Sequence, residues 1–409
     1  MSEPAPSRGA FTALQHRDFA LLWLGQGVST AGSQMRVVAV NYQIYLLTGS
    51  ALALGMVGLC RLIPLVVLGL GGGLLADRWD RRRLMMVTQT CMMLCSVGLA
   101  WWTWKGSIAP WAVYVLVTLA AVANTFDMPA RQALIPALVP RQTLQNALSL
   151  NILIWQVATI VGPTIGGLTI AHLGLAVVYA IDALSFLAVL CALLMMQYRH
   201  VPVASEPVSW RVALEGLRFV RGNPLIFSTM LLDFAAMVFG AASTMLPIFA
   251  AQVLHVGAEG LGWLYAAPSV GAVLAATYLA HRSPLSAQGT KVMVAVVAYG
   301  LCTAGYGASH NFWLTCLFLA GTGAADTLSM VIRSTMRQLL TPDELRGRMT
   351  AVGMLFFAGG PQLGEAEAGV AAHWMGLGPS VVVGGLACVA VVLLIDRGFP
   401  QLRRYSGAS

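Results

Sequence analysis

The chain carries very little charge for its length. Only 10% of its 409 residues are charged, whereas 58% are hydrophobic; soluble domains have charge at about a quarter of their positions. The chain contains long apolar runs of about 20 residues, the length needed to cross a bilayer, and few charges lie inside them. This composition excludes a soluble globular protein and predicts an all-α polytopic membrane protein.

The groups that support disulfides, metals or catalysis are also missing. All seven cysteines fall inside apolar runs, where a free thiol acts as a small buried hydrophobe. The seven histidines occur singly, without the spacing of metal ligands. The sequence has no phosphate-binding Gly-x4-Gly-Lys-Ser/Thr loop, and no nucleophile, base and orienting group can be assembled. We therefore expect no metal, no cofactor, no ATP hydrolysis and no enzyme activity.

The net charge of +8 does not indicate a nucleic-acid partner. Nearly all arginines and lysines are assigned to short loops on one side of the membrane, where positive charge collects in membrane proteins. The exceptions are Arg36, Arg61 and Lys105. The residues from Met1 to Arg17 are polar and contain proline, so we interpret them as a cytoplasmic tail rather than a cleavable signal.

The apolar runs predict twelve transmembrane helices. They lie near residues 19–47, 52–76, 84–104, 111–130, 146–171, 175–197, 225–253, 259–281, 290–308, 311–332, 348–372 and 377–396. We expect two six-helix bundles, 19–197 and 225–396, with a cytoplasmic tail at 1–18, a cytoplasmic linker at 198–224 and a second cytoplasmic tail at 397–409. Six tryptophans gather at predicted outer ends, as an interfacial belt would: Trp101, Trp102, Trp104, Trp111, Trp313 and Trp374.

An internal repeat relates the two bundles. The segment from Gly58 to Pro64 in the second span matches that from Gly262 to Pro268 in the eighth. Gly-Pro-x-x-Gly occurs in the fifth span at Gly162 and again in the eleventh at Gly360. A parallel repeat of six spans is typical of transporters in which one half rocks against the other around a central site.

The linker contains an amphipathic segment from Ser209 to Arg221. Its apolar side chains share one face of a helix and its charged side chains another. We expect this helix to lie on the inner membrane surface and connect the two bundles.

The loop Gly73–Arg83 carries a family resemblance. Gly73, Asp77, Arg81 and Arg82 fall on the fixed positions of the signature loop between helices two and three of the major facilitator superfamily, while Asp80 stands where that family usually has glycine. The motifs at 126–132, 215–219 and 342–348 resemble the branch that contains the enterobactin exporter and macrolide efflux pumps.

The resemblance implies a function as well as a fold. It implies a secondary transporter of the bacterial inner membrane that exports a small amphipathic molecule, of the drug or siderophore type, in exchange for protons. Cargo would enter a central cavity from the cytoplasm or the inner leaflet, and the carrier would work as a monomer among membrane lipids. An uptake porter or a lysolipid flippase would share the fold. A membrane sensor that transports nothing would usually carry a soluble domain.

The resemblance also assigns roles to two groups of residues. Gly73, Asp77, Arg81 and Asp127 would form a charge relay that latches the inner gate; the alternative for such charges is simple solvation in a loop. Gly162, Pro163, Gly166 and Gly167 resemble the antiporter motif of exporters. Glycine and proline inside a helix permit close packing and a bend, so an ordinary packing seam is the alternative reading.

Carboxyl groups inside the spans are candidates for proton carriers. Burial favours the neutral form of a carboxyl, so such a group can take up and release a proton. Asp233 lies near the middle of the seventh span and Glu365 well inside the eleventh. We predict that these two carry protons. Glu367 and Asp182 are expected to be local hydrogen-bond or ion-pair partners.

Arg36 and Arg61 lie inside the first and second spans and keep their charge. Each requires a counter-charge or a water-filled cavity. One hypothesis is that they attract an anionic or phenolate substrate, with Gln34, Asn41 and Tyr265 as further cavity residues. The alternative is a fixed pairing with Asp182, Asp233 or Glu365.

Overall fold

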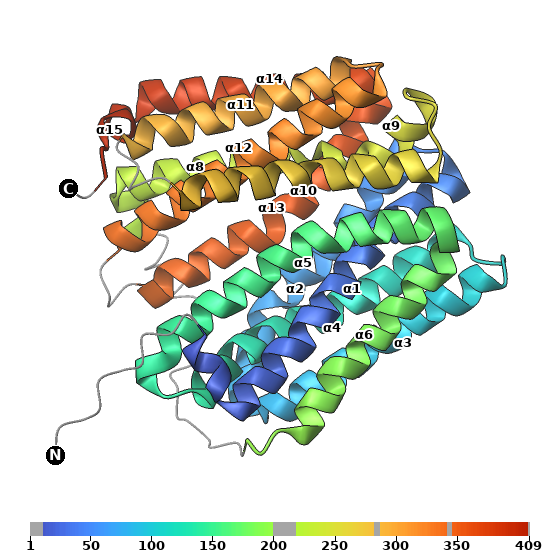
Figure 1. Cartoon of the computed structure of the whole chain (residues 1–409), viewed down its shortest axis with the longest axis vertical. Coiled ribbons are helices and arrows are strands. Elements are labelled where there is room, and N and C mark those ends of the chain that lie inside the picture. The colour runs from blue at the N-terminus through green and yellow to red at the C-terminus, as the bar shows by residue number, and fades with distance from the viewer. Residues whose placement is uncertain (1–10, 199–217, 282–286, 342–345, 408–409) are drawn as a thin grey trace. The chain divides into compact units, whose positions relative to one another are not determined.

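The structure is a computed structural model that describes residues 11–198, 218–281, 287–341 and 346–407. Every regular element in this part of the chain is helical (Figure 1). The long helices are α1 (Arg17–Thr48), α2 (Ala51–Arg78), α3 (Arg81–Trp104), α4 (Pro110–Leu138), α5 (Leu144–Leu173), α6 (Leu175–Met195), α8 (Pro224–Phe239), α10 (Ala258–Ala280), α11 (Gln288–Ala308), α12 (Phe312–Leu340), α13 (Arg346–Met375) and α14 (Leu377–Gly398). The short ones are η1 (Thr12–Gln15), η2 (Arg141–Thr143), η3 (Ala241–Met245), α9 (Leu246–Gln252) and α15 (Pro400–Arg404).

The helices have the length and apolarity of membrane spans. Within the described residues, ten segments satisfy both criteria, and α1 and α13 occupy the two remaining predicted positions. Apolar side chains point outward along these helices, and the tryptophans predicted at the outer ends are exposed, Trp104 by 73% and Trp374 by 81%. An apolar exterior of this kind suits lipid rather than water. The expectation of an all-α polytopic membrane protein is confirmed.

The chain divides into two compact units, which we call the N-terminal and C-terminal units. The N-terminal unit contains residues 1–40 and 63–207, and the C-terminal unit contains 41–62 and 208–409. The last part of α1 and the first part of α2 therefore belong to the C-terminal unit, although the chain on either side of them belongs to the N-terminal one. The predicted boundary at 198–224 does not anticipate this assignment of residues 41–62 to the C-terminal unit.

In the N-terminal unit, α3 packs against both α4 and α6 (Figure 1). One end of the unit is closed by an apolar cluster that includes Phe19, Met85, Leu134 and Leu193, all almost fully buried. Ala13 of η1 joins this cluster, and its backbone N–H donates to Asn146 Oδ1 at 2.9 Å. The last residues of the predicted N-terminal tail are thus packed against the helices.

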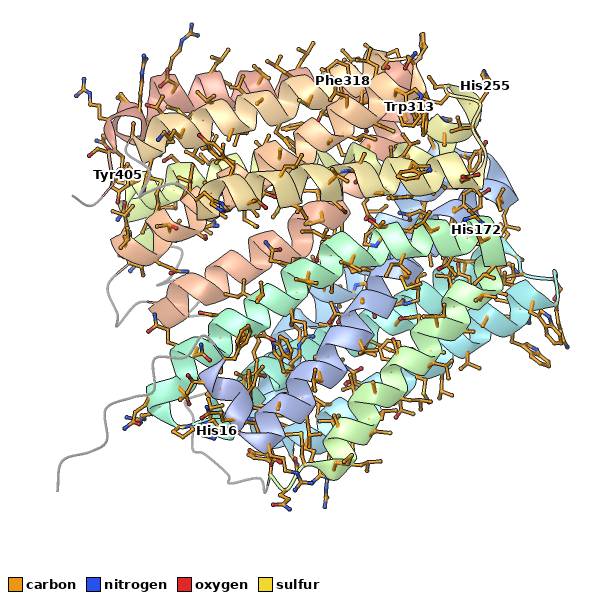
Figure 2. All side chains as sticks on the ribbon, in the orientation of Figure 1. His16, His172, His255, Trp313, Phe318 and Tyr405 are labelled. Atoms are coloured by element: carbon orange, nitrogen blue, oxygen red, sulfur yellow. The ribbon has the colours of Figure 1, made fainter. Side chains whose placement is uncertain are left out.

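In the C-terminal unit, α11 packs against both α12 and α14, and α10 packs against α12 (Figure 1). Trp313 and His255 lie at one end of this unit and Tyr405 at the other (Figure 2). The backbone of Tyr405 accepts a hydrogen bond from the Gly289 N–H at 3.0 Å. The predicted C-terminal tail therefore contains α15 and packs beside the start of α11.

Several turns follow directly from single residues. Asp80, the departure from the family loop, caps α3 by accepting hydrogen bonds from the backbone N–H groups of Arg82 and Arg83. Gly174 between α5 and α6 has φ 86° and ψ 170°, and Gly376 between α13 and α14 has φ 84° and ψ 162°. These angles favour glycine. Their occurrence at matching places in the two halves supports the internal repeat.

Two of the predicted spans need correction, and one predicted segment lies largely outside the described residues. The predicted span at 225–253 is interrupted, because α8 ends at Phe239 and the chain passes through η3 before α9. The predicted span at 311–332 is too short, because α12 continues to Leu340 and takes Arg333 and Arg337 into the helix. The amphipathic segment from Ser209 lies outside the described residues as far as residue 217.

Candidate functional site

The N-terminal unit holds a buried ion pair between α1 and α6. Arg36 Nε lies 2.7 Å from Asp182 Oδ2, and the Asp182 side chain is fully buried. Ser96 on α3 donates to the same carboxylate at 2.5 Å, and Ser33 on α1 donates to it at 3.4 Å. Three helices are joined by this one carboxylate. Of the two hypotheses for Arg36, the geometry agrees with a fixed pairing.

Asp127 on α4 is the second buried carboxylate of this unit. It is 1% exposed, and its Oδ1 accepts hydrogen bonds from Thr88 at 2.8 Å and from Gln89 at 3.0 Å. It also interacts electrostatically with Arg131, whose guanidinium donates to Gln26 at 2.8 Å. Asp127 is thus held by α3 and α4, which argues against its being a solvated loop charge.

Of the other members of the predicted charge relay, only Arg81 has described side-chain contacts, and these are to a group other than Asp127. The Arg81 guanidinium donates to the backbone carbonyl of Ala133 at 2.9 Å. Gly73 and Asp77 belong to α2, but their side-chain surroundings lie outside the described part. A latch at the inner gate therefore stays a prediction.

The glycines of the Gly-Pro motif bring α5 close to α1. A Cβ atom on Gly162 would lie 2.8 Å from the Ala31 carbonyl oxygen, and one on Gly166 would lie 3.0 Å from Met35 Cα. Pro163 lies inside the helix, and Gly167 is buried. Beside this contact, Gln34 donates to Thr159 at 3.5 Å. The motif makes a packing seam; its link to transport direction remains a prediction.

In the C-terminal unit, the first part of α2 packs tightly on α13. A Cβ on Gly58 would lie 2.6 Å from the Gln362 carbonyl oxygen, so the backbones are in close contact. This contact sets Arg61 against Glu365, with Nη1 at 3.4 Å from Oε1 and 3.3 Å from Oε2. Both side chains keep some exposure, 17% for Arg61 and 12% for Glu365. The pair is direct and partly buried.

Tyr265 on α10 lies beside this pair. It interacts electrostatically with both Glu365 and Arg61, and its hydroxyl has no hydrogen-bond partner among the described residues. The Asn41 Oδ1 atom is also buried without a partner in that part of the chain. Tyr265 therefore interacts with the Arg61–Glu365 pair, and a cavity that these residues share stays a prediction.

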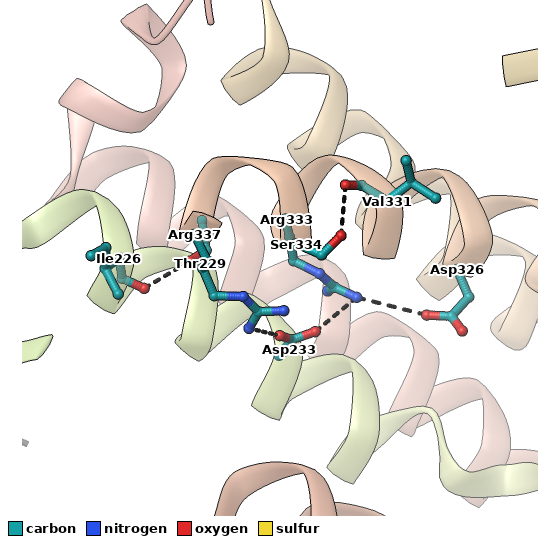
Figure 3. Close-up of polar contacts among 8 residues, drawn as sticks. All are labelled: Ile226, Thr229, Asp233, Asp326, Val331, Arg333, Ser334 and Arg337. Atoms are coloured by element: carbon teal, nitrogen blue, oxygen red, sulfur yellow. Dashed lines mark hydrogen bonds and ion pairs between the residues drawn. The ribbon is translucent and has the colours of Figure 1, made fainter. Parts of the chain in front are cut away.

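A second charge cluster joins α8 to α12 (Figure 3). Asp233 forms ion pairs with Arg333 Nη2 at 2.8 Å and with Arg337 Nη1. Arg333 Nη2 also lies 3.7 Å from Asp326 Oδ1. Both carboxylates thus share the Arg333 guanidinium, and Asp233 has the additional guanidinium of Arg337.

Asp326, Arg333 and Arg337 were missed at the sequence level for two different reasons. Asp326 falls inside the predicted span at 311–332 and should have been identified by the same rule as Asp233. Arg333 and Arg337 lie beyond residue 332, the predicted end of that span, whereas α12 continues to Leu340. Their spacing was the available signal: positions 326, 333 and 337 are seven and four residues apart and share one helical face.

The fold defines the class of protein. A bacterial homolog of the human lysosomal transporter Spinster, in an inward-facing and occupied conformation, aligns over 96% of this chain and 99% of its own with a TM-score of 0.71 at 15% identity. The nucleoside transporter NupG aligns over 95% and 99% with a TM-score of 0.64 at 15% identity. At such identities the likeness concerns the fold alone, which is that of a major facilitator transporter.

The sequence comparison places the chain more closely. A family model described as transmembrane secretion effector matches residues 8–404, so the chain belongs to the transmembrane secretion effector family of the major facilitator superfamily. The enterobactin exporter EntS of Citrobacter koseri is 26% identical over 95% of this chain and 94% of its own length, and that of Salmonella typhi is 26% identical with the same coverage. The chain is an integral membrane transporter of the major facilitator type and not an enzyme.

Proposed function

We propose that this protein exports a small amphipathic organic molecule across the bacterial inner membrane, in exchange for protons that move inward. The observation that carries the proposal is the end-to-end similarity to bacterial exporters, which spans 95% of the chain. In this proposal the protein works as a monomer by alternating access, with both termini in the cytoplasm. The arginines at the junction of α2 and α3, Arg78 and Arg81 to Arg83, support that orientation, because positive charge collects on the cytoplasmic side.

Ion pairs inside the spans support the proton exchange. An isolated charge is costly in the hydrocarbon region, so each arginine inside a span needs a carboxylate partner. For exchange, cargo and proton must occupy the site in turn: cargo binds while the carboxyl is ionised, and protonation of the carboxyl after cargo release resets the carrier. A paired carboxyl that retains access to water is therefore suited to exchange a proton for cargo.

The two predicted proton carriers differ in their surroundings. Asp233 is 5% exposed and is held by two guanidinium groups, which favours a permanent negative charge. Glu365 has a single arginine partner at 3.3 Å and is 12% exposed. We propose that Glu365 is the carboxyl that binds and releases the exchanged proton. Asp233 is then a structural counter-charge.

The cargo site is proposed to lie beside Arg61 and Tyr265. Arg61 offers a cationic guanidinium and Tyr265 a hydroxyl without a protein partner. Together they suit an anionic or phenolic oxygen on an otherwise apolar molecule. Arg36, which the sequence also suggested for this role, is neutralised by Asp182; we propose that it shapes the N-terminal unit instead.

The test is transport by the purified full chain in liposomes, with the electrical potential clamped and a pH gradient of about one unit. In vesicles whose lumen is acidic and faces the predicted outer side, enterobactin or erythromycin should accumulate in the lumen, and protein-free vesicles provide the control for passive trapping. Export by proton exchange is refuted if neither compound responds to the gradient. Proton-driven loss from the lumen would instead indicate uptake.

The variants Glu365→Gln and Glu367→Gln separate the role of the proposed carboxyl from a general loss of charge. Both remove one carboxylate from α13. We expect gradient-driven accumulation to fall about tenfold or more in Glu365→Gln, and Glu367→Gln, whose side chain has no ion pair within the described contacts, to retain it. Equal behaviour of the two variants would contradict the assignment.

A further inference from the structure

Asp326 lies in the middle of a membrane-spanning helix. It is about 21 Å from Phe312, the first residue of α12, at the helical rise of 1.5 Å per residue. Its side chain is nevertheless 54% exposed, whereas the Arg333 side chain beside it is 3% exposed. An accessible carboxylate at this depth is unusual, because charge is strongly disfavoured in hydrocarbon.

The exposed side of Asp326 does not point toward lipid. The large apolar side chains that α12 exposes are Trp313, Leu314, Leu317, Val331 and Leu339. At about 100° per residue, each of them lies about 120–180° around the helix from Asp326. Arg333 and Arg337 lie within about 20° of it on the same calculation. Asp326 therefore belongs to a polar face of α12 that is turned away from the apolar one, and the space next to it is accessible to water.

The two carboxylates of the cluster are held very differently. Asp233 accepts from both Arg333 and Arg337 and is almost fully buried (Figure 3). Asp326 has only a 3.7 Å contact with Arg333 Nη2, a nitrogen that lies 0.9 Å closer to Asp233. The negative charge of Asp326 can therefore be removed while Arg333 keeps its stronger partner.

The other groups around Asp326 are few. On α11, the Tyr299 phenol interacts electrostatically with it, and the Tyr299 hydroxyl donates to the Gly240 carbonyl at 3.0 Å. The charged side chains that interact with Asp326 are Arg333 on the same helix and Asp233 on α8, which packs against α12. After Glu259 in its first turn, α10 adds only tyrosines as titratable side chains.

We propose that Asp326 is a second proton-binding carboxyl of this transporter, alternating between the carboxylate and the neutral acid. With both aspartates ionised, the cluster of two arginines and two aspartates is neutral; one proton on Asp326 gives it a charge of +1. Arg333 Nε and Nη1, which are buried without an acceptor among the described residues, then face a site that favours an anion or water. This inference rests on the proposed proton exchange.

The test compares two kinds of transport by Asp326→Asn, in liposomes and with whichever of enterobactin and erythromycin the wild type moves. Each exchanged proton contributes a factor of about ten in accumulation for one unit of pH gradient. We expect gradient-driven accumulation to fall about tenfold or more, and exchange of labelled for unlabelled compound at equal pH to stay within about twofold. Asp326→Glu should restore the gradient response.

Two outcomes would overturn the inference. Accumulation within twofold of wild type would mean that Asp326 binds no transported proton, and equal loss of both kinds of transport in Asp326→Asn and Asp326→Glu would mean a structural role. Infrared difference spectra between neutral and acidic pH give a readout that needs no cargo: the wild type should gain a protonated-carboxyl band that Asp326→Asn lacks. If the wild type ignores the pH gradient, the proposed exchange fails, and this band alone decides whether Asp326 takes up a proton.

Discussion

Asp233→Asn should destabilise the protein far more than Asp326→Asn, although both remove one negative charge from the same cluster. Asp233 is 5% exposed and compensates two guanidiniums, of which Arg333 is 3% and Arg337 11% exposed. Removing one partner of a buried pair costs about 3–5 kcal/mol, because the remaining charge stays buried. Asp326 is 54% exposed and 3.7 Å from its arginine, so its contribution should be about 0–1 kcal/mol, as for exposed pairs.

The measurement is the free energy of unfolding in detergent, followed by tryptophan fluorescence during denaturant titration. A thermodynamic cycle of Asp233→Asn with Arg337→Gln isolates the pair, and contacting residues should couple by about 0.5–3 kcal/mol. The double variant should then be less destabilised than the sum of the two single variants. A difference between Asp233→Asn and Asp326→Asn below about 1 kcal/mol would refute the distinction between an anchored and an accessible carboxylate.

Three further changes test the remaining contacts. Exchanging the charges of Arg61 and Glu365 should restore part of the transport that each single reversal abolishes, measured in the same liposomes; no recovery would mean that their contact is not required as a pair. Gly162→Val should destabilise the N-terminal unit by about 1–3 kcal/mol through overpacking, since a Cβ at residue 162 would lie 2.8 Å from the Ala31 carbonyl oxygen. The control is Gly69→Ala, because a Cβ at residue 69 would have nothing within 4 Å. In thermal unfolding, this control should be neutral or stabilising. Ser96→Ala should cost about 1–3 kcal/mol by leaving the buried Asp182 carboxylate short of a donor, and an unchanged unfolding midpoint would contradict that.

The spans were predictable because the membrane imposes a simple rule on the sequence. A helix in hydrocarbon must be apolar over about 20 residues, and most helices of this chain satisfy that rule. The ends were less predictable. The segment after Ile332 is polar by composition, but Arg333 and Arg337 continue α12 because Asp233 on α8 neutralises them. Local hydropathy contains no information about a partner that lies 100 residues away in the chain.

The interruption of the seventh span was hidden for a related reason. Residues 224–252 are mostly apolar, with Asp233 as the one charged side chain, and their hydropathy predicts a single helix. The helix ends at Phe239, and the Gly240 carbonyl accepts the Tyr299 hydroxyl of α11 at 3.0 Å. A backbone group freed from a helix inside a membrane requires such a partner. The break therefore depends on a tertiary contact, and glycine alone does not reveal it.

The candidate site was only partly visible in the sequence, since a rule that selects intramembrane charges does not say which are paired. It identified Arg61 and Glu365, which the structure brings together at 3.3 Å. For Arg36 it left two readings open, a cargo contact or a fixed pairing, and the structure places Asp182 at 2.7 Å from that charge. Pairing depends on the direction in which each helix presents its side chains, and one sequence does not determine it.

Apart from Asp233, which two arginines hold, carboxylates of the C-terminal unit are more accessible than those of the N-terminal unit, and this difference supports the proposal of proton exchange in the C-terminal unit. Asp182 and Asp127 of the N-terminal unit are 0% and 1% exposed and accept hydrogen bonds from neighbouring helices. A proton could reach them only by opening that packing. Glu365 and Asp326 of the C-terminal unit each face one arginine and remain accessible. Their protonation can therefore change charge without disturbing the fold, which is what a carrier requires of a site that must load and release on every cycle.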